Sequence, residues 1–247
     1  ESAFCSPEEM NTTVLITRPA TESQDFRDSL AARGMTPVCD PLLTITPLPQ
    51  KFDAQPDALV ATSPQAFHIA YPDTWHGLPV FVMGDTSMQR AAACGFTNII
   101  SSGGEFETLV TLITKKVPSG QQILYLRGET IRHDLKSHLS DYQVLEHIVY
   151  QTQPASSLTE QTLALLKNGE LNVVTLFSPR SAEIFHDLLS RAGVAGASKD
   201  IKLLCLSSAV LESVKALSWQ AVRVARTPDQ QGMIDALQDW IGPARDA

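Results

Sequence analysis

Residues 59–66 read Leu-Val-Ala-Thr-Ser-Pro-Gln-Ala, and residues 175–182 repeat the pattern as Thr-Leu-Phe-Ser-Pro-Arg-Ser-Ala. In each copy a short apolar run ends at Ser-Pro, and a helical pattern follows. Such a run is typical of a strand that is buried on both faces of a parallel sheet. Serine is a good helix N-cap, and proline suits the first helical position. Each copy therefore predicts a strand whose carboxyl end leads into a helix, and two copies predict two similar halves.

The composition is that of a globular protein of one large α/β domain or two smaller ones. The chain has 247 residues, of which 43% are apolar and 19% charged, and it contains no apolar run near the ~18–20 residues that span a bilayer. Its net charge is −8, with no block rich in Lys or Arg. This balance argues against a nucleic-acid partner, whose binding rests on a basic surface, but it permits a small anionic ligand held by local groups.

The N-terminal residues and the cysteines bear on the cellular compartment in which the protein is expected. Residues 1–9 have neither the basic start nor the apolar core of a secretory signal, and we expect them to be a disordered leader or an expression remnant. The four cysteines, at positions 5, 39, 94 and 205, form no CxxC pair. We expect buried free thiols, as in a protein of the reducing cytoplasm.

Strand and helix patterns alternate along most of the chain. Strands are predicted at residues 14–17, 36–39, 58–62, 80–83, 97–101, 123–126, 143–146, 173–177, 202–206 and 222–225. Amphipathic helices are predicted between them, for example over 22–33 and around Phe106–Ile113 and Phe185–Ala192. This alternation predicts an α/β fold with parallel sheets, right-handed crossovers and helices on both faces. Two sheets of five strands fit the repeated pattern better than one sheet of ten.

Two further segments look extended and are flanked by proline and polar residues. They are Thr44–Thr46 and Ile148–Tyr150. They are either the two crossings of a hinge between domains or parts of a single sequential boundary. Periodicity does not choose between these alternatives.

Five short motifs resemble those of the uroporphyrinogen-III synthase family in order and spacing. They are Val14-Leu15-Ile16-Thr17-Arg18-Pro19, Thr62-Ser63-Pro64, Val82-Met83-Gly84-Asp85, Val149-Tyr150-Gln151-Thr152 and Phe177-Ser178-Pro179. The resemblance extends from about Val14 to Leu237. It implies two flavodoxin-like domains with parallel sheets, one inserted in the other and joined by a two-stranded antiparallel ladder. The discontinuous domain would comprise residues 11–42 and 154–247, the inserted domain 50–146, and the ladder 43–49 and 147–153.

The resemblance also implies a reaction. The family closes hydroxymethylbilane, a linear tetrapyrrole with eight carboxylates, into uroporphyrinogen III with inversion of ring D and loss of water, in a cleft between the two domains. This is a cyclising lyase of haem biosynthesis that needs no cofactor, and the sequence has no GxGxxG, phosphate loop or HExxH motif. The resemblance further implies a cytoplasmic monomer, with no nucleic-acid or membrane partner and with transient handover of substrate from the preceding pathway enzyme.

By the same resemblance, Tyr150 is the expected catalytic residue, a phenol that donates a proton to the departing hydroxyl. The alternative is a half-buried aromatic side chain on a connecting strand. The expected substrate-binding residues are Arg18, Thr62, Ser63, Gly84, Ser87, Gly103, Arg127, Gly128, Ser178, Arg180 and Ser208. The alternatives are that Thr62, Ser63 and Ser178 only cap helices and that Arg18 and Arg127 are ordinary surface residues. No metal ligands are expected.

The chain departs from the family pattern at three places. Gln65 stands where relatives often carry Arg, Ser87 where they carry Thr, and Ala209-Val210 where they carry Thr-Thr. These changes concern how the substrate is held. Two other classes of protein fit parts of the pattern. One is a two-domain protein that binds an anionic metabolite without catalysis. The other is a nucleotide-using enzyme such as a glycosyltransferase, for which the sequence lacks an Asp-x-Asp motif.

Overall fold

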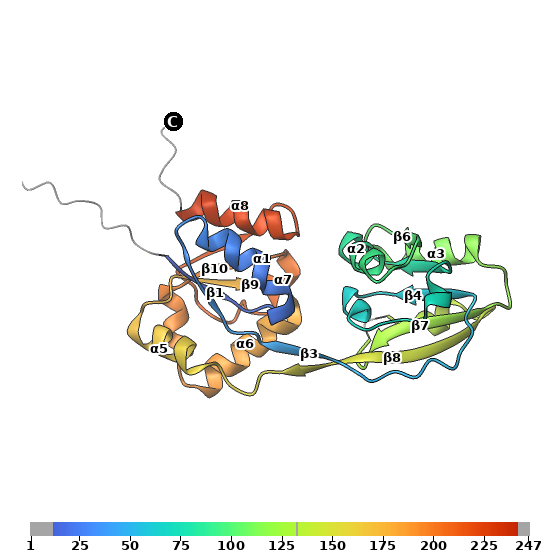
Figure 1. Cartoon of the computed structure of the whole chain (residues 1–247). Helices are drawn as coiled ribbons and strands as arrows, with labels where there is room; N and C mark the ends of the chain where they lie inside the picture. Colours follow the sequence, from blue (N-terminus) through green and yellow to red (C-terminus); the bar gives the residue numbers. More distant parts are fainter. Residues whose placement is uncertain (1–11, 132, 242–247) are drawn as a thin grey trace, which may run out of the picture. The chain divides into compact units, whose positions relative to one another are not determined.

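The computed structural model describes residues 12–131 and 133–241, so the expectation for residues 1–9 and Cys5 lies outside the described residues. The chain forms two compact units. The discontinuous unit extends up to Thr44 and resumes at Pro154, and the inserted unit comprises Ile45–Gln153. Figure 1 labels the helices and strands of each unit.

The discontinuous unit contains a five-stranded parallel sheet in the order β11-β10-β9-β1-β2. Its strands are β1 (Thr13–Ile16), β2 (Thr36–Cys39), β9 (Val173–Leu176), β10 (Lys202–Cys205) and β11 (Ala221–Val224). Its helices are α1 (Ala20–Ala31), α5 (Glu160–Asn168), α6 (Pro179–Arg191), η3 (Ala195–Asp200), α7 (Ser208–Glu212) and α8 (Gln230–Ile241). Every residue of the central strand β9 is buried, as expected for a strand covered on both faces.

Helices cover both faces of this sheet, and each face has its own apolar core. One core packs α5, α6 and α7 around Phe185, and the other packs α1 and α8 around Phe26. Figure 1 shows α1 and α8 on one side of the sheet and α5 and α6 on the other. The arrangement is that of a doubly wound α/β layer.

Hydrogen bonds join the early and late parts of the discontinuous unit. The buried hydroxyl of Thr17 donates to the carbonyl oxygen of Thr175 at 2.7 Å, and the hydroxyl of Thr175 donates to that of Leu15 at 2.8 Å. The carboxylate of Asp40, which is 2% exposed, accepts from the backbone N–H and hydroxyl of Thr159 at 2.9 and 3.0 Å. These bonds satisfy polar groups whose burial without partners would be costly.

The inserted unit contains the second sheet, in the order β3-β8-β7-β4-β5-β6. Its strands are β3 (Leu43–Pro47), β4 (Ala58–Ala61), β5 (Pro79–Val82), β6 (Asn98–Ser101), β7 (Gln122–Gly128) and β8 (Gln143–Pro154). Its helical segments are η1 (Pro64–Phe67), η2 (Asp73–Trp75), α2 (Asp85–Ala93), α3 (Phe106–Lys116) and α4 (Leu135–His138). One core packs η1 and α2 against the sheet, and the other packs α3 and α4 against the opposite face.

Strands β4 to β8 run parallel, whereas β3 runs antiparallel to β8. The direction follows from two backbone hydrogen bonds of 2.9 Å, from Leu48 N–H to Val149 O and from Ala155 N–H to Leu42 O, because one residue number rises as the other falls. The expected fold class, α/β with two mostly parallel sheets and an antiparallel ladder, is therefore confirmed. No helix within residues 12–131 and 133–241 is long and apolar enough to cross a membrane.

The prediction of an α-helix after the first Ser-Pro is wrong. Only the four-residue 3₁₀ helix η1 forms there, whereas the second Ser-Pro begins the thirteen-residue helix α6. In an α-helix the carbonyl oxygens of Ala66 and Phe67 would accept from residues four positions later. Instead the hydroxyl of Tyr71 donates to Ala66 O, and the thiol of Cys94 donates to Phe67 O. Side chains from outside the segment thus donate to carbonyl oxygens at the point where an α-helix would continue.

Two other expectations need correction. The strand expected at 143–146 and the second ladder strand expected at 147–153 are one continuous strand, β8. The thiols are free, as expected for Cys39, Cys94 and Cys205, but only Cys205 is buried, and the other two are half-buried.

Burial raises the pKa of the Cys205 thiol to about 12. Since the thiolate is the nucleophile, we expect iodoacetamide at pH 8 to alkylate Cys205 at least roughly tenfold more slowly than Cys39 or Cys94. Mass spectrometry of peptides from the native protein measures the three rates. Alkylation in urea, where burial is lost, gives the intrinsic rates of the three thiols. If these are equal and the three rates in the native protein are also equal, the expectation is contradicted.

Candidate functional site

Most of the residues predicted for the site in the inserted unit follow the carboxyl ends of its parallel strands. Thr62 and Ser63 follow β4, Gly84 follows β5, Gly103 follows β6, and Arg127 and Gly128 end β7. Tyr150 lies in β8, opposite Gly128. Because these strands are parallel neighbours, their carboxyl ends lie along one edge of the sheet, the edge where α/β folds bind ligands.

Thr62 is hydrogen-bonded to a tyrosine that the sequence analysis did not select. The hydroxyls of Thr62 and Tyr125 lie 2.8 Å apart, and the Tyr125 ring is almost fully buried. Burial raises the pKa of Tyr125, as do the nearby Tyr150 and Glu146, whereas the hydrogen bond to Thr62 and the charge of Arg127 lower it. The Tyr125 hydroxyl therefore stays protonated at neutral pH. Its position in an apolar strand pattern made it look like a simple core residue.

Tyr150 is positioned by an irregularity between β7 and β8. Arg127 pairs with Ile148, but the next residue, Gly128, pairs with Tyr150, so Val149 is left out of the register. Such a bulge redirects the side chains that follow it. The Tyr150 ring lies directly over Gly128: a Cβ at position 128 would be 2.7 Å from two ring carbons and 2.9 Å from the hydroxyl oxygen. Only glycine leaves room for the ring in this position.

Arg127 already has a carboxylate partner within the inserted unit. Its guanidinium lies 3.2 Å from the carboxylate of Glu146 and donates to the carbonyl oxygens of Gly128 and Glu129 at 2.8 and 3.2 Å. Only 15% of the Arg127 side chain is exposed. Arg127 therefore holds the turn after β7, and a ligand carboxylate would have to share its guanidinium with Glu146. Glu146 was not among the residues predicted from the sequence.

The other predicted residues of the inserted unit differ in what they offer a ligand. Ser63 caps η1, because its hydroxyl accepts from the Gln65 N–H at 3.3 Å. Gly84 is the N-cap of α2, and a Cβ there would meet open space. Gly103 has a φ of +71°, a conformation that favours glycine. Ser87, on α2, is 3% exposed, so it offers little surface to a ligand.

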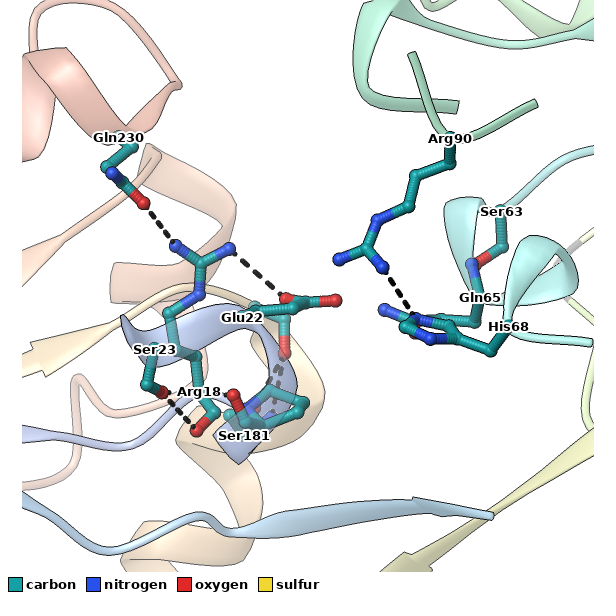
Figure 2. Close-up of polar contacts among 11 residues, drawn as sticks. Arg18, Glu22, Ser23, Ser63, Gln65, His68, Arg90, Ser181 and Gln230 are labelled. Carbon is teal, nitrogen blue, oxygen red and sulfur yellow. Dashed lines mark hydrogen bonds and ion pairs between the residues drawn. The ribbon is translucent and has the colours of Figure 1, made fainter. Parts of the chain in front are cut away.

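In the discontinuous unit, Arg18 lies beyond the end of β1 and is held on three sides. Its guanidinium donates to Glu22 at 3.1 Å and to Gln230 at 3.0 Å, as Figure 2 shows, and lies 4.6 Å from the ring centroid of Phe177. Its Nε is buried without a hydrogen-bond partner among the described residues. Arg18 is therefore not an ordinary surface arginine, since its head group is fixed at the carboxyl ends of β1 and β9.

The remaining predicted residues follow the neighbouring strands β9 and β10. The Ser178 hydroxyl caps α6 by accepting from the Ser181 N–H at 3.1 Å. Arg180 is half-buried and forms no ion pair with any residue in the described part of the chain. Ser208 is exposed in the first turn of α7. The cap function expected of Ser63 and Ser178 is confirmed, and their binding function stays a prediction.

The chemistry available at these strand ends is proton donation and anion binding. Tyr125 and Tyr150 supply phenol groups, Ser63 and Ser178 stand at helix starts, and the arginines supply charge. Within the described ranges no group of three or more His, Cys, Asp and Glu residues could hold a metal ion.

The Thr62–Tyr125 pair makes a testable contribution to stability. We expect Tyr125→Phe and Thr62→Val each to lower the free energy of unfolding by about 1 kcal/mol, because a buried hydroxyl loses its partner. The double variant should lose less than the sum, since both changes remove one bond. Urea unfolding of the four proteins measures this, and strict additivity would mean that the bond contributes nothing.

Comparisons with known proteins agree with the resemblance. The family model for uroporphyrinogen-III synthase HemD matches residues 24–235. Among solved structures, the uroporphyrinogen-III synthetase of Helicobacter pylori aligns with a TM-score of 0.58 at 15% identity, covering 93% of this chain and 99% of that one. A mutant uroporphyrinogen III synthase of Thermus thermophilus aligns with a TM-score of 0.55 at 14% identity, covering 92% and 97%. At these identities the two structures show the shared fold alone. No curated protein matches at a significant level.

Proposed function

This chain belongs to the uroporphyrinogen-III synthase family, and on that premise we propose that it converts hydroxymethylbilane into uroporphyrinogen III. The family is one of cofactor-independent cyclising lyases of haem biosynthesis. The observation that carries the proposal is the match of the family model over residues 24–235. The phenols and arginines at the strand ends are consistent with it, because the substrate is polyanionic and must lose water.

We assign the proton transfer to Tyr150. The reaction begins when the hydroxyl of the hydroxymethyl group leaves as water while its carbon stays on the pyrrole, and a phenol can donate the proton that the departing oxygen needs. Two features of the inserted unit support the assignment: the ring lies over Gly128, and the buried Tyr125 hydroxyl is close enough to interact electrostatically. Apart from this proton, the work is geometric, because ring closure at the less accessible carbon depends on how the chain is folded.

Substrate carboxylates are assigned to the groups at the carboxyl edges of both sheets. In the discontinuous unit these are Arg18, Arg180 and the residues at the starts of α6 and α7, Ser178 and Ser208. In the inserted unit they are Thr62, Ser63, Gly84, Gly103, Arg127 and Gly128, while the burial of Ser87 leaves it the weakest candidate. Backbone N–H groups at helix starts suit carboxylates because of the positive end of the helix dipole.

Product analysis tests the proposal. Freshly generated hydroxymethylbilane is incubated with the purified protein, and the oxidised porphyrin isomers are separated by chromatography. We expect the type III isomer to predominate over the type I isomer that forms without enzyme. Formation of type I alone, by protein shown to be folded, would overturn the proposal and favour a protein that binds an anionic metabolite without catalysis.

We extend the same proposal to the state of the enzyme. It acts as a cytoplasmic monomer and receives the unstable substrate by transient handover from the preceding enzyme. Light scattering at several protein concentrations tests the first part, with 26.9 kDa expected. Faster type III formation in the presence of the preceding enzyme than with the same flux of free substrate would support the second.

A further inference from the structure

A second cationic group lies in the inserted unit, at a position that neither the repeated Ser-Pro pattern nor the family motifs singled out. Nη1 of Arg90 lies 3.3 Å from Nε2 of His68, and Figure 2 shows the guanidinium directed at the imidazole ring. A guanidinium can only donate hydrogen bonds, so the imidazole nitrogen is the acceptor. His68 thereby fixes the direction of the Arg90 side chain.

The topology brings this pair to the candidate site. His68 directly follows η1, which starts at the end of β4, and Arg90 lies on α2, which starts just after β5. Strands β4 and β5 are parallel neighbours, so both segments begin at the same edge of the sheet. Side chains on a helix lean toward its N-terminus. Arg90 therefore extends toward the edge that carries Thr62, Ser63 and Gly84.

Arg90 differs from Arg18 and Arg127 in its charge balance. Arg18 is paired with Glu22 and Arg127 with Glu146, whereas no carboxylate in the described part of the chain forms an ion pair with Arg90. The side chain is half-buried, and its hydrogen-bond partner there is a ring nitrogen. The positive end of the α2 dipole is already matched by Asp85 in the first turn. Arg90 is thus a positive charge at this edge with which no carboxylate among the described residues of its unit forms an ion pair.

We propose that Arg90, oriented by His68, binds a side-chain carboxylate of the linear tetrapyrrole substrate. The inference rests on the proposed function and adds a binding residue to it. Arg90 presents a planar fork that can hold a carboxylate with two parallel hydrogen bonds, which Lys cannot reproduce. Its contribution is made to the bound substrate and the transition state alike, so it lowers KM and leaves kcat nearly unchanged.

The experiment compares Arg90→Met and Arg90→Lys with wild type and with Lys115→Met. Lys115 is exposed in the last turn of α3 and is not part of the site, so its replacement is a control for net charge. We measure KM for hydroxymethylbilane and, without turnover, the dissociation constant of uroporphyrin III, an octacarboxylate, by quenching of tryptophan fluorescence. Arg90→Met should raise the KM and the dissociation constant about tenfold or more. Arg90→Lys should raise them less, and Lys115→Met should leave both constants unchanged.

Replacing His68 separates its role from that of Arg90. His68→Gln keeps an acceptor oxygen for the guanidinium and should stay near wild type, whereas His68→Leu should raise KM by several-fold. Arg90→Met binding uroporphyrin III as tightly as wild type would overturn the inference, as would a wild-type protein that does not bind it. Because binding requires no turnover, this result is independent of whether type III product is formed. If the proposed function were wrong, only the separation of the type I and type III porphyrin isomers would show it.

Discussion

Replacing Gly128 by alanine should lower kcat about tenfold or more, approaching the effect of removing the Tyr150 hydroxyl, because displacing a catalytic group by about 1 Å can be very costly. The added methyl group would lie 2.7 Å from two carbons of the Tyr150 ring and 2.9 Å from its hydroxyl oxygen. The far end of the ring is the part that must move, and the hydroxyl moves with it. Turnover of hydroxymethylbilane, followed as type III product, measures the loss.

Two comparisons show whether the effect passes through Tyr150. Gly77→Ala is the control within the same unit, since a Cβ there meets nothing within 4 Å, and it should keep full activity. The double variant with Tyr150→Phe should be little slower than Tyr150→Phe alone, because the displaced hydroxyl is already gone. A Gly128→Ala enzyme with wild-type kcat would show that the position of the ring is irrelevant to the reaction.

Tyr150→Phe should reduce turnover by an order of magnitude or more, roughly the lower part of the range for loss of a general acid. The substitution removes only the hydroxyl, and the ring keeps its place in the core that it shares with Leu126 and Val149. The thermal unfolding midpoint should therefore remain close to that of wild type. We expect slowing rather than abolition, because much of the work consists of positioning.

Tyr142→Phe is the matched control for this variant. The Tyr142 hydroxyl donates to the carbonyl oxygen of Val117 at 3.0 Å, at the start of the parallel strands rather than at their carboxyl ends. The control likewise loses one phenolic hydroxyl, and it should keep its activity. Unchanged turnover in Tyr150→Phe would remove Tyr150 from the mechanism.

The layered fold could be predicted from the sequence because its signals are local. Apolar runs such as Val173–Leu176 indicate strands buried on both faces, and the spacing of Phe185 and Leu188 indicates a helix that packs on them. The first Ser-Pro was misinterpreted because its helical segment ends at Phe67, where Tyr71 and Cys94 donate to the last carbonyl oxygens. Neither of these contacts is visible in the pattern that follows Pro64.

The candidate site was less predictable, since its geometry depends on pairs that are distant in sequence. Tyr125 meets Thr62, Glu146 meets Arg127, and Gly128 meets Tyr150 only once β4, β7 and β8 are aligned. Residue type and spacing carry no trace of the register shift that leaves out Val149. The motifs selected several of the right strand ends but not the partners that orient the side chains there.

The insertion of one unit into another also sets the order in which the nascent chain can fold. All strands of the inserted sheet have left the ribosome once residue 154 has emerged, and that sheet can then close. In the discontinuous unit β1 lies between β2 and β9, so one edge of β1 stays unpaired until residues 173–176 are made. An unpaired apolar edge is a site of aggregation. A pause in synthesis after residue 154 has emerged and before residue 173 has emerged would therefore leave a finished inserted unit and an exposed β1 edge in the same chain, a stage prone to aggregation.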